Sequence, residues 1–274
     1  MKLLFTDLDD TLLNNQSQVS PKTRAFLDEF LAAGNRLVFC SGRPLMSVLE
    51  VKEKAGLAQS GIFVSCSNGS LIYDCDHRRI IKKISLPLSY VSYLQKQAEA
   101  FSLHIQTYRD GDGGEAVISP ADDEEIRFYR RRIHLPLVVS ENLVDALTEE
   151  PCKMLAISLH NLDKLQTFQK SIAGWAEGKV RTIYSSDKYL EIFDWNAGKG
   201  SSLLFLCSYL GIPVSDSYAA GDAENDISML EAAGCGIAMK NASDTVKAHA
   251  DVVTDLDNDQ DGLADMMRKL LRRL

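Results

Sequence analysis

The stretch LLFTDLDDTLL, residues Leu3–Leu13, begins with an apolar run and then places three carboxylates within four positions. The apolar run predicts a buried strand of a parallel sheet, because a strand covered on both faces need not alternate apolar with polar residues. Side chains two positions apart point the same way from an extended chain, so we expect Asp7 and Asp9 to face the crevice where open α/β sheets bind ligands. Crowded carboxylates repel each other, and a hard divalent cation such as Mg²⁺ offsets this most simply. An acidic loop that caps the next helix is the alternative.

The segments that follow alternate between helix and strand. Ser20-Pro21 is typical of a helix start, and Leu37–Cys40 is a second short apolar strand that ends in Ser41-Gly42-Arg43. Ile62–Cys66 is a third such strand and ends in Ser67-Asn68-Gly69. This order predicts a parallel sheet with right-handed crossovers, which is the α/β class.

From about residue 85 the pattern changes to short strands mixed with helices, which is typical of an α+β module. The α/β pattern of strands and helices returns at Tyr189–Ile192 and continues to a last predicted helix at residues 260–273. The sequence therefore predicts a discontinuous core of residues 1–84 and 188–274 with an inserted α+β domain of residues 85–187.

Composition limits the classes of partner. The 274 residues have a formal net charge of -8 and a pI of about 5.2, which argues against nucleic acid or an anionic membrane surface. A basic cluster at Arg127–Arg132 is interpreted as a solvated helix face, with contact to substrate as the alternative. No apolar run reaches the ~18 residues of a membrane span, and we expect a soluble, cytoplasmic protein with six reduced cysteines. The oligomeric state does not follow from the sequence.

Four predicted strand or helix ends now bring polar motifs to one sheet: DLDDT at 7–11, SGR at 41–43, KG at 199–200 and GDAEND at 221–226. In this order they resemble the four motifs of the haloacid dehalogenase superfamily. The place of the insertion resembles the Cof-type branch, which has a type IIB cap. The resemblance covers the whole chain and implies a Rossmann-like core with an inserted cap domain.

The resemblance implies the following catalytic roles. Asp7 is the nucleophile that forms an aspartyl-phosphate, and Asp9 protonates the leaving alkoxide and later deprotonates the attacking water. Lys199 neutralises the nucleophile and the phosphoryl charge. The implied metal site comprises Asp7, Asp9, Asp222 and Asp226, with Asp9 reaching Mg²⁺ through its backbone carbonyl and Asp226 holding the metal's waters.

The resemblance also implies a phosphate-binding set, in which Ser41 donates to a phosphoryl oxygen. Asn225 is expected beside the metal's waters, and Asn68 matches a recurrent Cof-type NG motif. The complete predicted substrate-binding set is Ser41, Gly42, Arg43, Asn68, Lys199 and Asn225.

The insertion of residues 85–187 is interpreted as a lid that closes over the site and selects the leaving group. Arg127–Arg132 and the turn Gly111–Gly114 are the candidate contacts within it. Asp10 stands where many members of the superfamily have glycine, so no role is assigned to it.

The leading hypothesis is a magnesium-dependent phosphatase that acts on a small phosphorylated metabolite, with sugar phosphates as the expected class. A phosphosugar mutase is a second hypothesis, and release of free phosphate separates the two. A receiver-type signalling module, which also uses aspartates, Mg²⁺, a hydroxyl group and a lysine, is the third. The large insertion and the second acidic motif argue against the third hypothesis.

Overall fold

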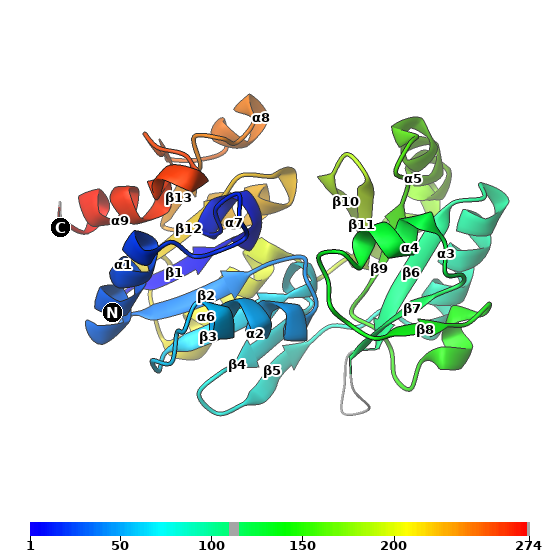
Figure 1. Ribbon diagram of the computed structural model, residues 1–274, viewed down its shortest axis with the longest axis horizontal. Coiled ribbons are helices and arrows are strands. Elements are labelled where there is room, and N and C mark those ends of the chain that lie inside the picture. Colours follow the sequence, from blue (N-terminus) through cyan, green and yellow to red (C-terminus); the bar gives the residue numbers. More distant parts are fainter. Residues whose placement is uncertain (110–114, 273–274) are drawn as a thin grey trace. The chain divides into compact units, whose positions relative to one another are not determined.

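An eight-stranded sheet forms the centre of the first of two compact units, with the strand order β14-β13-β12-β1-β2-β3-β4-β5 (Figure 1). The structure is a computed structural model and describes residues 1–109 and 115–272. The ladders from β14 to β3 are parallel, and β4 pairs antiparallel with β3. The strands are β1 (Leu3–Thr6), β2 (Arg36–Cys40), β3 (Ile62–Cys66), β4 (Leu71–Asp74), β5 (Arg79–Lys83), β12 (Ser217–Gly221), β13 (Cys235–Ala238) and β14 (Val252–Val253).

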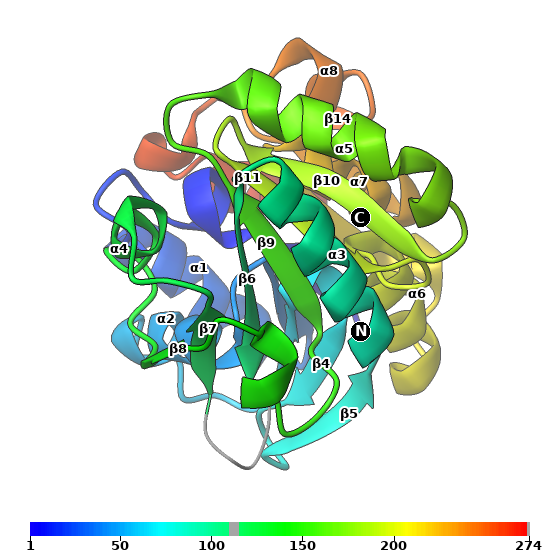
Figure 2. The same cartoon turned by 90° about the vertical axis from the view of Figure 1, so that its right-hand side faces the viewer.

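Strand β1 lies inside this sheet, between β12 and β2, and all four of its residues are buried. The prediction of a doubly covered parallel strand is therefore confirmed. Helices of this unit lie on both sides of the sheet, with α1 on one side and α6 and α7 on the other (Figures 1 and 2). The helices are α1 (Pro21–Ala32), α2 (Leu45–Lys54), α6 (Lys199–Leu210), α7 (Ile227–Ala232), α8 (Asp244–Lys247) and α9 (Gly262–Arg272).

Local sequence explains why α1 begins where it does. The Ser20 side chain accepts a hydrogen bond from the backbone N–H of Thr23, and Pro21 occupies the first turn, where its missing N–H costs nothing. On the other side of the sheet, Leu203 of α6 and Met229 of α7 pack in one cluster with Phe5. Burial of these apolar side chains stabilises the strand that positions Asp7.

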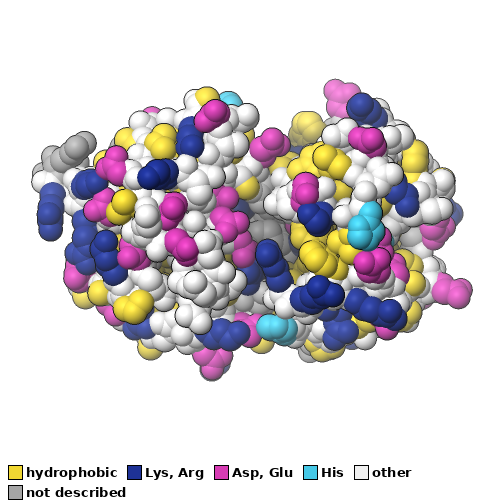
Figure 3. All heavy atoms as spheres, turned by 45° about the horizontal axis from the view of Figure 1, so that its top comes forward, with side chains coloured by type: hydrophobic (Ala, Val, Ile, Leu, Met, Phe, Trp, Pro, Cys, Tyr) yellow, Lys and Arg dark blue, Asp and Glu magenta, His cyan; other side chains and the backbone are white. Residues whose placement is uncertain are grey.

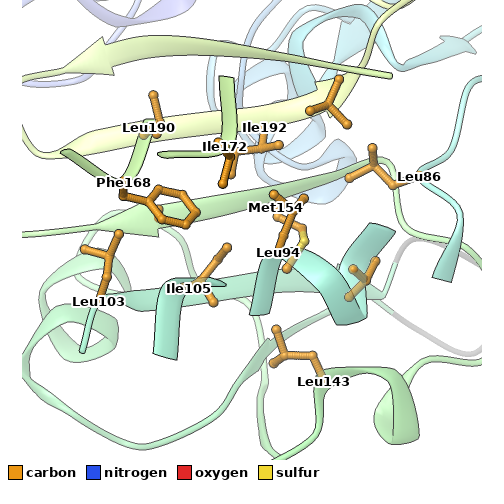
Figure 4. Packing of buried hydrophobic residues seen from close by; sticks show 14 of the residues in the cluster. Leu86, Leu94, Leu103, Ile105, Leu143, Met154, Phe168, Ile172, Leu190 and Ile192 are labelled. Atoms are coloured by element: carbon orange, nitrogen blue, oxygen red, sulfur yellow. The ribbon is translucent and has the colours of Figure 1, made fainter. Parts of the chain in front are cut away.

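The second unit contains a six-stranded sheet with the order β10-β11-β9-β6-β7-β8. Helices α3 and α5 lie over one face of this sheet (Figure 2), where Leu94 and Phe168 pack on Met154 and Ile192 (Figure 4). The elements are α3 (Leu88–Ala100), β6 (His104–Arg109), β7 (Ala116–Ser119), α4 (Glu124–Tyr129), β8 (Leu137–Val139), β9 (Lys153–Ile157), α5 (Leu162–Ala176), β10 (Val180–Ser186) and β11 (Tyr189–Asp194).

The unit boundaries differ from the predicted ones at residues 42–47, 83–84 and 188–197. The core unit comprises Met1–Ser41, Val48–Lys82 and the chain from Gly198 onward, and the inserted unit comprises Gly42–Ser47 with the described part of Lys83–Ala197. The predicted return to the core at residue 188 comes too early, because β11 pairs with β9 and β10 of the inserted sheet. The apolar alternation of Tyr189–Asp194 suits a strand of either sheet, so the pattern could not decide between them.

Several expectations from composition have structural counterparts. All six cysteines lie among the described residues and are free thiols. Acidic and basic side chains are both present on the face that Figure 3 shows. Within the described ranges, no helix has the length and apolar character needed to cross a membrane.

The sequence offered two candidate substrate contacts in the insertion, and the structure describes only one of them. The arginines of 127–132 are exposed, and the Arg127 guanidinium pairs with Asp122 at 3.0 Å, which fits a solvated face. The turn Gly111–Gly114 lies outside the described residues.

Candidate active site

The six strands from β14 to β3 are parallel and end at the same edge of the core sheet, and a predicted motif follows each of β1, β2 and β12. Thr6 at the end of β1 is in register with Ala220 of β12 and with Phe39 of β2. Asp7 continues the β1 ladder, because its backbone N–H donates to the Ala220 carbonyl at 2.9 Å. Carboxyl ends of parallel strands are where open α/β sheets bind ligands. The fold therefore brings the residues after β1, β2 and β12 to one edge.

The Lys199 ammonium lies between two carboxylates at this edge. Its Nζ donates to Asp7 Oδ1 at 2.6 Å and to Asp226 Oδ1 at 2.5 Å. The Lys199 side chain is only 1% exposed, so both contacts are protected from water. Charge-assisted hydrogen bonds of this length in a desolvated place hold the three side chains in fixed positions.

The carboxylate of Asp226 also shapes the loop that follows β12. Its Oδ2 accepts from the backbone N–H groups of Asp222 and Ala223, each at 3.0 Å. Asp226 therefore connects Lys199 to the backbone of the loop that presents Asp222. The Asp222 carboxylate in turn accepts from Thr11 Oγ1 at 2.8 Å, a contact that sequence reasoning did not anticipate although Thr11 is part of the DLDDT motif.

The charges of this site do not balance. Burial, with the carboxylates around it, raises the pKa of Asp7 well above its ordinary value against the opposing effect of Lys199. Burial and the nearby Asp226 raise the pKa of Asp222 to about 7. Burial alone would lower the pKa of Lys199, but Asp226 and Asp7 outweigh it and raise it well above its ordinary value. One ammonium faces three carboxylates, so the site has surplus negative charge that a further cation would balance.

The carboxylate geometry fits a hard divalent cation. Asp7, Asp222 and Asp226 each offer an oxygen, and these oxygens lie within 4.8 Å of one another. Oxygen ligands with surplus negative charge are what Mg²⁺ prefers. Asp9, the fourth predicted metal residue, is not in this group. It is half-buried in the segment Leu8–Leu12, and its φ of -69° and ψ of 130° are not helical.

Two glycines of the motifs allow Lys199 to reach its place. Lys199 is the first residue of α6, and a Cβ on Gly200 would lie 2.2 Å from the Ser228 carbonyl oxygen. A Cβ on Gly69 would lie 2.2 Å from the carbonyl oxygen of Gly198, the residue before Lys199. Such distances exclude any side chain, so these glycines permit close approach of backbone segments. Sequence reasoning named the motifs but missed this packing role.

Two predicted substrate-binding amides meet beside the carboxylates' loop. Asn225 Nδ2 donates to Asn68 Oδ1 at 3.3 Å, although the residues are 157 positions apart. Asn68 Nδ2 and Asn225 Oδ1 are buried and have no hydrogen-bond partner among the described residues. If the oxygen and nitrogen positions of both amides were exchanged, one amide nitrogen and one amide oxygen would still have no hydrogen-bond partner among the described residues. A ligand with both donor and acceptor groups would satisfy them, and an unsatisfied buried group costs about 1–3 kcal/mol.

The remaining predicted residues follow β2. Ser41 is buried, its backbone N–H donates to the Ser65 carbonyl at 2.9 Å, and its own carbonyl accepts from Asn68 N–H at 3.1 Å. Gly42 and Arg43 are half-buried and belong to the inserted unit. The backbone of Ser41 is thus fixed to the strand that leads to Asn68.

A family model described as haloacid dehalogenase-like hydrolase matches residues 4–267. This chain belongs to the haloacid dehalogenase-like hydrolases. The resemblance to this superfamily is thereby confirmed, and the enzyme belongs to its phosphoric monoester hydrolases.

Similar proteins extend over nearly the whole chain. Phosphatase YwpJ of Bacillus subtilis is 30% identical over 99% of this chain and 100% of its own length. The 5-amino-6-(5-phospho-D-ribitylamino)uracil phosphatase YwtE of the same organism is 29% identical over 99% of this chain and 98% of its own.

Solved structures agree with the fold. A haloacid dehalogenase-like hydrolase from Bacteroides thetaiotaomicron has a TM-score of 0.87 at 28% identity, with coverage of 98% of this chain and 99% of that one. A haloacid dehalogenase subclass IIB sugar phosphatase has a TM-score of 0.80 at 21% identity, with the same coverage. An α/β core with an inserted α+β unit is therefore the fold of this hydrolase.

Proposed function

We propose that this hydrolase is a magnesium-dependent phosphatase that releases phosphate from small phosphomonoesters, with sugar phosphates as its substrate class. The observation that supports it most is the Lys199 ammonium held between Asp7 and Asp226 at the carboxyl edge of the sheet. Phosphoryl transfer needs positioning and charge stabilisation around one nucleophile, and this arrangement supplies both.

Asp7 is the proposed nucleophile. Its carboxylate oxygen forms a bond to phosphorus while the bond from phosphorus to the leaving oxygen breaks, and Asp9 gives that oxygen a proton. Water then attacks the aspartyl-phosphate, Asp9 takes a proton from it, and phosphate leaves Asp7 free. Lys199 stabilises the negative charge of the phosphoryl oxygens in both steps.

The proposed metal ligands are Asp7, Asp222 and the backbone carbonyl of Asp9. Asp226 belongs to the same cluster of carboxylates. Mg²⁺ bound there supplies the positive charge that the three carboxylates lack and neutralises phosphoryl oxygens. Asp226 also orients Lys199 and the loop backbone, because it is hydrogen-bonded to both.

Ser41, with the adjoining Gly42 and Arg43, is proposed to bind the phosphoryl group. The buried amides of Asn68 and Asn225 are proposed to use their unfilled donor and acceptor on the substrate. The inserted unit is proposed to close over the site and to select the leaving group.

The substrate class is supported by the names of similar proteins. YwtE is a phosphatase of a phosphorylated ribityl compound, and a protein with the same fold is a sugar phosphatase. Both substrates are small polyhydroxylated phosphate esters. The predicted absence of nucleic-acid and membrane partners and the cytoplasmic location remain predictions.

The test is a phosphate-release screen of purified protein against sugar phosphates, nucleotides and cofactor phosphates. We expect release from sugar phosphates with Mg²⁺, loss of turnover in EDTA, and recovery when Mg²⁺ is added back. Full turnover in metal-free protein would contradict the assignment as a magnesium-dependent phosphatase. Return of the phosphoryl group to a second hydroxyl, without free phosphate, would indicate a phosphosugar mutase instead.

Metal binding has a readout that does not need activity. Because Mg²⁺ relieves repulsion among three carboxylates, it should raise the melting temperature, and at 100 times the dissociation constant the gain is about 2.7 kcal/mol. Asp222→Asn should remove most of that gain. An equal gain in the variant would place the ion elsewhere.

A further inference from the structure

A buried ion pair lies in the inserted unit. Lys153 on β9 and Glu191 on β11 contact each other at 2.6 Å between Nζ and Oε2, with side chains only 2% and 6% exposed. They project from the sheet face opposite to α3 and α5, because Met154 and Ile192, their neighbours in the two strands, pack in the cluster beneath those helices. Alternation of side chains thus places two charges on the face opposite to α3 and α5, where α4 packs in a second apolar cluster.

The Lys153 ammonium has further partners within the protein. Besides Glu191, Nζ donates to the Gly42 carbonyl oxygen at 2.7 Å and lies 4.9 Å from the centre of the Tyr108 ring. The carboxylate and the carbonyl use two of the three donors of the ammonium, and the aromatic face lies beside the cation. Ser185 Oγ donates to the other oxygen of Glu191 at 3.1 Å. A lysine held in this way is a positioning group rather than a ligand for substrate.

Stability alone does not explain this pair. Taking two charges out of water is costly, and apolar residues of similar volume are often as stabilising or more so in such places. What apolar residues cannot do is donate a hydrogen bond to the Gly42 carbonyl. The contact with Gly42 is therefore the feature that requires a lysine.

Gly42 directly follows Ser41, and their Cα atoms are about 3.8 Å apart, as in any trans peptide. The Ser41 backbone is also hydrogen-bonded to the backbones of Ser65 and Asn68. We propose that Lys153, with its charge balanced by Glu191, is a positioning residue that fixes the backbone after Ser41 and thereby the phosphate-binding geometry of Ser41, Gly42 and Arg43. This inference rests on the proposed function, because it requires that segment to bind the phosphoryl group.

Three variants separate positioning from stability. Lys153→Met removes the contact with Gly42 but leaves Glu191 buried without its partner. The double variant K153M/E191L removes both charges, so it should regain the stability that Lys153→Met loses. Tyr108→Phe is the matched control: it keeps the ring beside Lys153 and removes only the hydroxyl, which bonds Gln106 and Tyr129.

Two readouts apply to each variant. Hydrogen exchange of peptides that cover residues 40–48 reports the backbone directly and needs no substrate. The kcat/KM for p-nitrophenyl phosphate, with the inhibition constant of inorganic phosphate, reports phosphoryl binding. Small displacements of positioned groups cost up to about 10²-fold in rate. We expect faster exchange at 40–48 and roughly a 10- to 100-fold loss of kcat/KM in both Lys153 variants, with about 10-fold weaker phosphate inhibition.

The double variant decides the matter. If it is as stable as the wild type and also regains wild-type kcat/KM, Lys153 serves stability alone and the proposal is wrong. Unchanged exchange at 40–48 in the Lys153 variants would also overturn it, and so would an equal effect of Tyr108→Phe. A wild-type protein that releases phosphate from no ester would refute the proposed function, and the exchange result then decides by itself whether Lys153 fixes this backbone.

Discussion

The ammonium of Lys199 neutralises part of a site in which three carboxylates crowd together. Its partners differ in their other contacts, because Asp226 is bonded to loop backbone whereas Asp7 is the proposed nucleophile. Removal of the ammonium therefore affects both the charge that phosphoryl transfer must stabilise and the charge that folding must bury.

We expect Lys199→Ala to fold in the presence of Mg²⁺ and to lose on the order of 10²-fold or more in turnover, as is typical when one preorganised charge-stabilising group is removed. Steady-state kinetics with p-nitrophenyl phosphate and circular dichroism check the two parts. Lys2→Met is the matched control, since Lys2 also pairs with an aspartate, Asp216 at 2.7 Å, but near the surface. That pair should contribute at most about 1 kcal/mol and nothing to turnover. Near-normal turnover of a folded Lys199→Ala protein would mean that the motif is misassigned.

The roles of Asp9 and Asp7 can be distinguished with substrates that have different leaving groups. Asp7→Asn should abolish the covalent intermediate with every substrate. With Asp9→Asn, first-turnover phosphorylation of Asp7 should fall much less for p-nitrophenyl phosphate than for a sugar phosphate, because p-nitrophenolate departs largely without a proton. General acid catalysis is worth about 10² to 10⁴-fold, so rapid mixing resolves the difference. An equal loss with both substrates would assign Asp9 to metal geometry or to orientation of Asp7.

At the scale of elements, the site depends on how closely α6 approaches α7. The first turn of α6 is bonded to β3 through Ser202 and Ser65, whose hydroxyls are 2.8 Å apart, and it contacts α7 at Gly200. A displacement of α6 therefore displaces Lys199 directly.

Gly200→Ala should push α6 away from the Ser228 carbonyl, at a cost of about 1–3 kcal/mol, and should lower kcat/KM as well as stability. Gly174→Ala in α5 is the control, because a Cβ there meets nothing within 4 Å. Alanine suits a helix interior better than glycine, so Gly174→Ala should raise stability by about 0.5–1 kcal/mol with kcat/KM unchanged. Thermal unfolding and kinetics of the two variants check this. Wild-type kcat/KM in Gly200→Ala would show that the site tolerates movement of α6.

At the scale of the molecule, the inserted unit has cores of its own. One cluster joins α3 and α5 to the six-stranded sheet, and a second lies on the opposite face with α4. All ladders of that sheet run between strands of the insertion itself.

We therefore expect residues 83–197, expressed alone, to fold and to unfold cooperatively on heating, as measured by circular dichroism. Phe168→Ala in the same segment should cost about 3–5 kcal/mol and weaken or abolish the transition, because Phe168 is fully buried. A segment without a cooperative transition would show that its cores depend on the rest of the chain.

The sequence determined those features that are local. The apolar run Leu3–Thr6 specified a buried strand, and the strand-end position of Asp7 followed from it. The motifs around Ser41, Lys199 and Asp222 were readable because each is a short string at the end of one element. The sheet then brings such ends together, since parallel strands share a carboxyl edge.

Pairing over long distances was decided only by the tertiary structure. Strand β11 belongs to the inserted sheet because it pairs with β9 and β10, and its apolar alternation would suit either sheet. The contact between Lys153 and Gly42 spans 111 positions, and the clash that makes Gly200 necessary involves the carbonyl of Ser228. Side-chain patterns report which face of an element is buried, whereas the choice of partner depends on the packing of the whole chain, which no local window contains.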